Sequence, residues 1–199
     1  AASAGGHEAV VKALVDAGAD INARGGQYGN AFHAAAYEGH VRVLELLMSS
    51  ETTMLLHDRY ERTLLWWAAA GGSVATVKVL IAQYNFDPRA PNKFGQTPFW
   101  IASKKAHVSV SDFLAKECGE TNVQRQDPSK NDDNRTSMTC DVCTLNVKGN
   151  EFHLHCQSCA GGDWNMCEDC EGRGAFCEDT THFLVKRTMK DGNWVEVTS

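Results

Sequence analysis

Seven of the eight cysteines lie between Cys140 and Cys177, and a histidine follows at position 182. Their spacing is C-x2-C-x12-C-x2-C-x7-C-x2-C-x6-C-x4-H. A C-x2-C pair suits metal binding, because a tight turn directs both thiolates at one tetrahedral ion. Eight soft ligands complete two four-ligand sites, for which structural zinc is the favoured metal. The predicted ligands are Cys140, Cys143, Cys156, Cys159, Cys167, Cys170, Cys177 and His182.

These residues also allow other interpretations. A disulfide framework would suit a secreted protein, but no signal-peptide pattern is present, so we expect an intracellular chain, cytoplasmic or nuclear. Cys118 is left over and is expected to be an ordinary thiol. His153 and His155 could serve as ligands in principle, although each would add to a set that is already complete. A closed set of four ligands favours a structural metal over a catalytic one.

Charge is unevenly distributed along the chain. Residues 1–118 hold 11 Lys+Arg and 11 Asp+Glu, whereas residues 119–199 hold 8 and 14 and so carry the whole net charge of −6. An acidic C-terminal half disfavours nucleic-acid binding, which needs the opposite sign, and suits a cationic partner. No run approaches the roughly 20 apolar residues that span a membrane.

The first 118 residues contain a repeated pattern. The segment A-x-x-G-H-x-x-V recurs with His7, His40, Ser73 and His107 in equivalent places, at steps of 33, 33 and 34 residues. Each unit pairs an Ala-rich helix with one that carries apolar residues at helical spacing. These apolar residues are Val10, Val11 and Leu14; Val43, Leu44 and Leu47; and Val77, Leu80 and Ile81. Neighbouring pairs must stack to bury their apolar faces.

This period, together with Thr97-Pro98-Phe99-Trp100-Ile101-Ala102, resembles the ankyrin repeat, whose signature is T-P-L-H-x-A. The resemblance implies an all-α solenoid over residues 1–118, with about three and a half units and the first one truncated. The chain starts at Ala1 in the middle of this pattern, so we expect it to be part of a longer protein whose open end frays or stacks on further repeats. Ala106 stands where the other units have glycine.

The ankyrin resemblance also implies a binding groove formed by hairpin tips and first helices. Carried over to this chain, its main candidates are Arg59, Tyr60, Arg62, Lys93, Phe94, Lys104 and Lys105, with Gln27, Tyr37, Glu38, His57 and Gln96 beside them. The last two units contribute five cations and no carboxylate. We therefore expect an acidic protein partner, and the alternative is a solvated face with incidental charge. Trp66, Trp67 and Trp100 are expected to be packing residues.

The composition changes after residue 118. Residues 119–137 contain one aliphatic side chain, Val123, among polar residues, which predicts a flexible tether. The expected finger covers residues 138–190 and leaves a C-terminal tail at 191–199. A tether of this kind lets two modules bind one partner or two.

The cysteine-rich segment resembles the ZZ-type zinc finger. The matching pieces are Cys140-Asp141-Val142-Cys143, His155-Cys156-Gln157-Ser158-Cys159, Asp163-Trp164-Asn165-Met166-Cys167-Glu168-Asp169-Cys170 and Cys177-Glu178-Asp179-Thr180-Thr181-His182. The resemblance implies a small β-containing cross-brace that binds two Zn²⁺ ions. Cys140, Cys143, Cys167 and Cys170 would hold one ion, and Cys156, Cys159, Cys177 and His182 the other. Ankyrin repeats followed by such a finger resemble the C-terminal region of large fungal ankyrin proteins.

Some ZZ fingers recognise protein N-termini through acidic residues, and the matching positions here are Asp141, Asp163 and Asn165. Two carboxylates remain for an α-ammonium or another cationic peptide group, while the third position is an amide. A purely structural or generic interaction finger remains open.

We expect a non-catalytic protein-interaction module. The alternative is a ubiquitin ligase or a ubiquitin-pathway adaptor, since RING domains share the cross-brace. A RING closes with a further C-x2-C pair, however, and this chain closes with C-x4-H. The sequence has no G-x-S-x-G, phosphate loop or H-E-x-x-H.

Overall fold

The structure is a computed structural model of the 199-residue chain. It describes residues 1–25, 28–50, 56–119, 138–140, 142, 145–147, 151–159, 164–177, 181–190 and 193–197. The chain divides into two compact units, Ala1–Gln126 and Asp127–Ser199. Apart from Gly119, the expected tether lies outside the described residues, as do Gln27, Asp141, Cys143 and Asp163.

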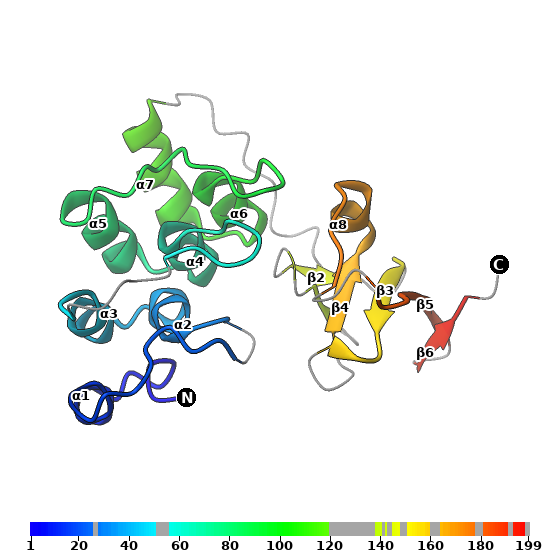
Figure 1. The fold of residues 1–199 in the computed structure, drawn as a ribbon. Helices are drawn as coiled ribbons and strands as arrows, with labels where there is room; N and C mark the ends of the chain where they lie inside the picture. The colour runs from blue at the N-terminus through cyan, green and yellow to red at the C-terminus, as the bar shows by residue number, and fades with distance from the viewer. Residues whose placement is uncertain are drawn as a thin grey trace. The chain divides into compact units, whose positions relative to one another are not determined.

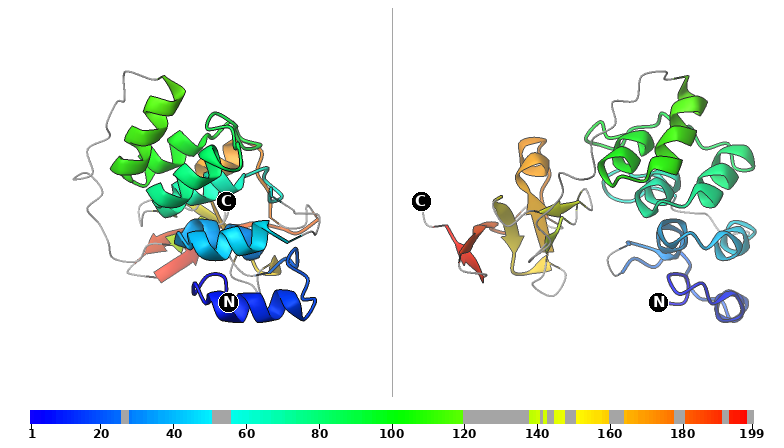
Figure 2. Two further views of the ribbon diagram at one scale, coloured as in Figure 1. Left: turned by 90° about the vertical axis from the view of Figure 1, so that its left-hand side faces the viewer. Right: turned by 180° about the vertical axis from the view of Figure 1, so that it is seen from behind.

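The N-terminal unit is a stack of helix pairs, coloured blue to green in Figures 1 and 2. Helices α2, α4 and α6 form one row, in which α2 packs on α4 and α4 on α6. Helices α1, α3, α5 and α7 form the second row and also pack in sequence order. This arrangement confirms the predicted repeat of helix pairs. The bounds are α1 Glu8–Asp16, α2 Ala31–Glu38, α3 Val41–Met48, α4 Leu64–Gly71, α5 Val74–Ala82, α6 Pro98–Lys104 and α7 Val108–Cys118.

Local sequence sets where these short helices begin and turn. In the first row, the side chains of Asn30, Thr63 and Thr97 each accept a hydrogen bond from the backbone N–H three residues later. Such N-caps satisfy donors that the first helical turn leaves unpaired. The turn to the second helix needs a left-handed residue, which is Gly39 at φ 79° and Gly72 at φ 80°.

The core of the N-terminal unit lies between the two rows of helices. Trp66 and Trp67 are fully buried there, so they are packing residues, as expected. The interior also contains Phe32, Leu44, Leu47, Leu64, Leu65, Leu80, Ile101 and Leu114. In α1, Val11 is buried, whereas Val10 and Leu14 are 51% and 49% exposed at the expected open end of the array. No packed helix covers that side of α1 in the part of the chain that the structure describes.

The C-terminal unit is built mainly from short antiparallel strands. Its elements are β1 Met138–Thr139, β2 Asn146–Val147, β3 His153–Cys156, β4 Trp164–Cys167, α8 Glu168–Gly172, β5 Val185–Lys190 and β6 Asn193–Glu196. Strands β1 and β2 pair with each other, and the other four form a sheet in the order β4-β3-β5-β6.

Strand β6 lies beyond residue 190, the expected end of the finger. Strand β6 pairs with β5 over Arg187–Lys190, and the ring of Trp194 lies 4.4 Å from that of His153. Residues 193–196 therefore form the edge strand of this sheet, within the segment that the sequence suggested was a tail. Within the described ranges, no helix is long and apolar enough to cross a membrane.

Candidate metal centres and the hairpin surface

Four predicted ligands converge in the C-terminal unit. Cys156 ends β3, Cys159 follows it in a turn, and Cys177 and His182 come from the segment after α8. Their ligand atoms all lie within 4.8 Å of one another. The Nδ1 atom of His182 lies 3.6, 3.3 and 3.9 Å from the Sγ atoms of Cys156, Cys159 and Cys177, respectively.

These separations can be compared with a zinc tetrahedron. Bonds of about 2.3 Å to sulfur and about 2.05 Å to nitrogen place neighbouring ligands about 3.8 Å apart for two sulfurs and about 3.6 Å apart for sulfur and nitrogen. The observed N–S separations of 3.3–3.9 Å bracket that value. The donor set of three thiols and one imidazole therefore fits a tetrahedral ion in type and in spacing.

A second group contains Cys140, Cys167 and Cys170, whose sulfurs also lie within 4.8 Å of one another. The Sγ atoms of Cys140 and Cys170 are 3.9 Å apart, close to the tetrahedral edge. Strand β4 leads directly into α8, so that one helical turn brings Cys170 beside Cys167. Cys143, the fourth expected ligand, lies outside the described residues. The two groups take their ligands in alternation along the chain.

The thiols of both groups suit metal binding more than disulfide formation. None of the seven cysteines in the described ranges forms a disulfide, although several sulfurs lie close together. Burial raises the pKa of the Cys156 thiol, but hydrogen bonds outweigh it and bring the pKa down to about 7. One donor is the backbone N–H of Cys159, 3.4 Å from that sulfur. Because zinc binds thiolates, a lowered thiol pKa favours occupancy near neutral pH.

The two histidines considered as alternative ligands lie outside both groups. Neither His153 nor His155 belongs to a ligand group among the described residues. The β3–β4 register places His155 opposite Asn165, and its Nδ1 lies 2.9 Å from Asn165 Oδ1. Asn165 is only 4% exposed, which disfavours the predicted contact with a bound peptide. Its amide partners the imidazole of the neighbouring strand, and only the strand register reveals this pairing.

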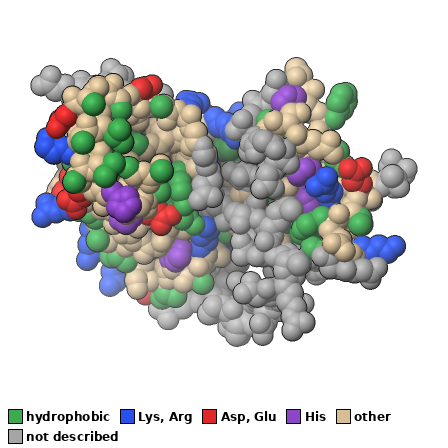
Figure 3. Space-filling view, turned by 90° about the horizontal axis from the view of Figure 1, so that it is seen from below, with side chains coloured by type: hydrophobic (Ala, Val, Ile, Leu, Met, Phe, Trp, Pro, Cys, Tyr) green, Lys and Arg blue, Asp and Glu red, His purple; other side chains and the backbone are tan. Residues whose placement is uncertain are grey.

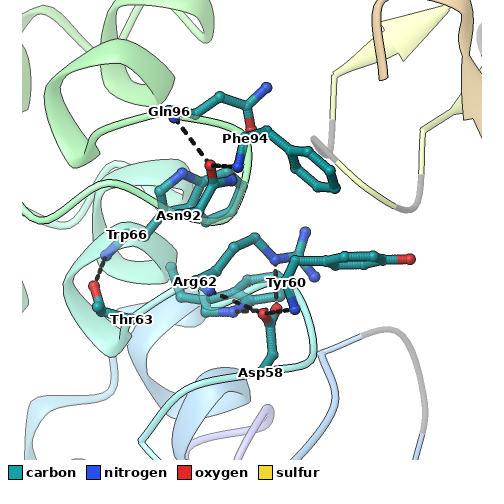
Figure 4. A network of polar contacts seen from close by, with 9 residues as sticks. Asp58, Tyr60, Arg62, Thr63, Trp66, Asn92, Phe94 and Gln96 are labelled. Carbon is teal, nitrogen blue, oxygen red and sulfur yellow. Dashed lines mark hydrogen bonds and ion pairs between the residues drawn. The ribbon is translucent and has the colours of Figure 1, made fainter. Parts of the chain in front are cut away.

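The hairpin between α3 and α4 forms the polar network of Figure 4 around Asp58. Its Oδ1 accepts hydrogen bonds from the backbone N–H groups of Tyr60 and Arg62 at 2.9 and 3.0 Å. Its Oδ2 pairs with the Arg62 guanidinium and accepts from Trp67 Nε1 at 3.3 Å. The guanidinium also lies 4.2 Å from the Trp67 ring centre.

This network buries three of the seven main groove candidates. Arg62, Tyr60 and Phe94 are 4%, 4% and 8% exposed, and the last two rings lie 5.8 Å apart. Burial raises the pKa of Tyr60 to about 12. The groove candidates of the last two units included no carboxylate, but Asp58 of the same hairpin pairs with Arg62. These three side chains build the hairpin, whereas Arg59, Lys93 and Lys104 are exposed and Lys105 is half-buried.

The next hairpin repeats the arrangement with an amide, 34 residues later. Asn92 Oδ1 accepts from the backbone N–H groups of Phe94 and Gln96 at 3.0 and 2.9 Å (Figure 4). The sequence signal for both was the repeat spacing itself, because Asp58 and Asn92 occupy equivalent places. At the end of α6, Lys105 Nζ donates to the hydroxyl of Tyr37 on α2 at 3.1 Å, so it already has a partner.

Comparison with known proteins identifies the family of the N-terminal unit. A family model described as "Ankyrin repeats (3 copies)" matches residues 1–92 and 32–127, ending before the cysteine-rich segment. The chain is 26% identical over 151 residues to the ankyrin repeat and KH domain-containing protein mask-1 of Caenorhabditis elegans. It is 25% identical over 145 residues to an ankyrin repeat and KH domain-containing protein of Caenorhabditis briggsae. These alignments cover 75% and 72% of the chain but only 6% and 5% of the relatives.

Proposed function

Because the chain belongs to the ankyrin repeat family, we propose that it is a non-catalytic protein-interaction module. The helical array offers one binding surface, and a zinc-stabilised finger of the ZZ type offers a second. Stacked helix pairs present exposed hairpin tips on a rigid support, which suits binding. Protein binding through the array is the part that family membership supports most directly.

The finger would hold two zinc ions. Cys156, Cys159, Cys177 and His182 would bind one, and Cys140, Cys143, Cys167 and Cys170 the other. Zinc would supply a cross-link between distant segments, a structural role in which these side chains fold the unit around it. The observation that carries this proposal is the convergence of three sulfurs and an imidazole nitrogen at tetrahedral spacing.

Native mass spectrometry of the full chain tests the zinc proposal. We expect two zinc ions in the native protein. Cys156→Ser and Cys140→Ser should each remove one ion, whereas Cys118→Ser, the matched control outside both groups, should retain two. A mass that lacks both ions, or that indicates sulfurs bonded to each other, would overturn the proposal.

For the array, we propose an acidic protein partner. The support is the exposure of Arg59, Lys93 and Lys104 on or near neighbouring hairpins, with Lys105 at the end of α6. Cations of this kind favour association with a negatively charged surface, and more so at low salt. The buried residues Tyr60, Arg62 and Phe94 would stabilise the hairpins on which Arg59 and Lys93 lie.

Fluorescence anisotropy with a labelled Glu-rich peptide tests the acidic-partner proposal. Binding should weaken at least about tenfold in the Arg59→Glu/Lys93→Glu chain and should weaken with added salt. Arg42→Glu, an exposed charge reversal on α3, serves as the control and should bind as the wild type does. Equal binding by all three proteins, or none by the wild type, would contradict the proposal.

For the finger, we propose recognition of a free protein N-terminus or another cationic peptide by Asp141 and Asp163. The support is the ZZ resemblance and the acidity of residues 119–199. Asn165, which is buried against His155, is left out. A peptide with a free N-terminus should bind the wild type and lose affinity when it is acetylated or when either aspartate is changed to Ala. If acetylation has no effect, the finger recognises something else.

A further inference from the structure

Strand β6 is the outer strand of its sheet, and one of its two sides has no strand beside it in the described part of the chain (Figure 1). Asn193, Val195 and Glu196 are exposed, and Trp194 is half-buried. Proteins often protect such an edge with a lysine, a proline or a β-bulge. The strand Asn-Trp-Val-Glu contains neither residue, and its register with β5 runs through four successive pairs without a bulge. The edge is therefore open to another strand.

The register shows which backbone groups face this open edge. The N–H of Val197 donates to the carbonyl oxygen of Lys186 on β5 at 2.8 Å. In an antiparallel pair, residues that bond to the neighbouring strand alternate with residues that do not. Val195 therefore also bonds to β5, whereas Trp194 and Glu196 direct their N–H and C=O groups away from β5, towards the open edge.

The side chains of β6 alternate across the sheet in the same order. Trp194 and Glu196 lie on one face, where Glu196 Oε1 is 3.8 Å from Arg187 Nη2. Val195 and Val197 lie on the other face and are 36% and 38% exposed. In Figure 3, green hydrophobic side chains lie at the surface of the C-terminal unit, on the right, beside blue and red charged ones. Exposed apolar side chains therefore flank the outward-facing backbone groups.

We propose that β6 pairs with β6 of a second copy of the chain, antiparallel and centred on Val195. Trp194 of each copy then exchanges both of its backbone hydrogen bonds with Glu196 of the other copy. Every outward-facing N–H and C=O of the two strands has a partner in this pairing, and the two sheets become one continuous sheet. An antiparallel pair of identical strands has two-fold symmetry, so the contact closes as a dimer.

The sequence of β6 favours its own copy in this register. Val195 lies opposite Val195 in a pair without mutual hydrogen bonds, where the Cα atoms are about 4.5 Å apart and the side chains meet. Glu196 lies opposite Trp194, so no like charges face each other. Centring the pair on Glu196 would oppose two carboxylates and would leave Trp194 facing residue 198, beyond the strand. Centring it on Trp194 would leave Glu196 facing residue 192, before the strand.

This self-association is separate from the two binding surfaces proposed above, because it uses neither the array nor the metal ligands. A single pair of strands buries less than the roughly 1,200–2,000 Å² of a standard interface, so we expect a weak dimer with a Kd on the order of 100 µM.

Sedimentation equilibrium of the full chain, at concentrations that span this Kd, tests the proposal. Glu196→Pro removes the outward N–H but no bond to β5, and proline is tolerated at such edge positions. Glu196→Ala, the matched control, keeps the N–H and loses the carboxylate. We expect Glu196→Ala to dimerise as the wild type does, within about twofold, and Glu196→Pro to dimerise at least about tenfold more weakly, because each copy loses a hydrogen bond.

Cross-linking locates the centre of the pair. Directly opposed residues in a pair of this kind have Cα atoms close enough for a disulfide. With oxidised glutathione as the oxidant, Val195→Cys should yield a covalent dimer, and peptide mass spectrometry should find the two introduced sulfurs bonded to each other. Lys190→Cys, which is exposed on β5 on the same face, is the control and should remain mostly monomeric.

Several outcomes would overturn the proposal. The wild type could stay monomeric, Glu196→Pro could dimerise as the wild type does, or Glu196→Ala could lose as much affinity as Glu196→Pro. Equal cross-linking of Val195→Cys and Lys190→Cys would also count against it. Amide NMR spectra of the variants show whether the sheet stays folded, and if Glu196→Pro unfolds, the cross-link decides.

Discussion

Asp58 shows how a single carboxylate can organise a hairpin. It accepts two backbone N–H groups, the indole N–H of Trp67 and the guanidinium of Arg62, which is almost completely buried. A buried cation needs such a partner, because removing the partner leaves an uncompensated charge away from water.

Asp58→Ala should therefore lower the free energy of unfolding by about 3–5 kcal/mol. Urea unfolding followed by circular dichroism measures the change. Asp16→Ala is the matched control: it breaks an exposed pair with Lys12 and should cost no more than about 0.5 kcal/mol. Similar losses in both variants would mean that the buried network contributes little.

His33 predicts a pH dependence of stability. Burial, reinforced by nearby Arg62 and opposed by Asp58, lowers its pKa from 6.5 to about 4. Between these values the unfolded chain binds more protons than the folded one, so stability falls as pH drops from about 6.5 to about 4. The loss attributable to this group is roughly 3 kcal/mol.

The His33→Leu variant should flatten this part of the profile. Urea unfolding at several pH values between 4 and 7 measures it, with the helical signal of the N-terminal unit as the readout. An unchanged slope in the variant would assign the pH dependence to other groups.

At the scale of elements, the helices of the array are too short to be stable alone. Helices of fewer than about 12 residues are marginal in water, and those of the first row have seven or eight residues. Their stability must come from caps, turns and packing. Substitutions at a strained turn or at a tight helix contact therefore test these contributions.

Ala106 is a strained turn residue. Its φ of 56° lies in the left-handed region, where Gly39 and Gly72 stand in the other units. Ala106→Gly should raise the free energy of unfolding by about 0.5–1 kcal/mol, since relief of strain exceeds the added chain entropy. Ala13→Gly, within α1, should instead lower the free energy of unfolding by about 1 kcal/mol. Thermal unfolding of both variants checks the signs, and destabilisation by Ala106→Gly would count against strain at this turn.

Gly71 is a packing residue at the contact of α4 with α2. A Cβ atom there would lie 1.7 Å from the carbonyl oxygen of Tyr37. Gly71→Ala must push the two helices apart and should lower Tm, with a cost of about 1–3 kcal/mol or more. Gly172→Ala in α8 provides a contrast, because its Cβ would meet nothing within 4 Å. Full retention of Tm in Gly71→Ala would show that the helices can separate at little cost.

At the scale of the whole molecule, the two units have different sources of stability. The array has a continuous apolar core, whereas the C-terminal unit has few large buried side chains in its described part, mainly Met166, and two groups of metal-ligand side chains. In a unit of this size the core alone rarely supplies much stability, and a structural metal is a common addition.

Zinc chelation should therefore unfold the C-terminal unit and leave the array folded. Hydrogen exchange resolved along the chain measures this: protection should vanish in β3, β4 and β5 and persist in α2, α4 and α6. The zinc-saturated chelator is the control. Loss of protection in both units would contradict independent stability, and retention in both would contradict the zinc proposal.

The array was predictable because its information is local and periodic. Steps of 33, 33 and 34 residues and the apolar spacing of the second helices indicated helix pairs, and the family match confirms ankyrin repeats. The metal-ligand candidates could also be predicted from the sequence, because the two cysteines of a C-x2-C pair are only three residues apart and therefore lie close together in space. Those described residues gather into the two groups, while zinc itself remains a proposal.

Burial and partner choice were decided by tertiary structure. From the sequence, Arg62 was predicted to be a groove cation, but in the structure it is enclosed by Asp58 and Trp67. Asn165 was predicted to contact a peptide, but the β3–β4 register places it against His155. Likewise, the segment that contains β6 was predicted to be a tail, but in the structure β6 pairs with β5. Sequence spacing determines which residues are neighbours along one element. The approach of other elements decides whether a charged or polar side chain meets water or a partner, and that depends on the folded chain as a whole.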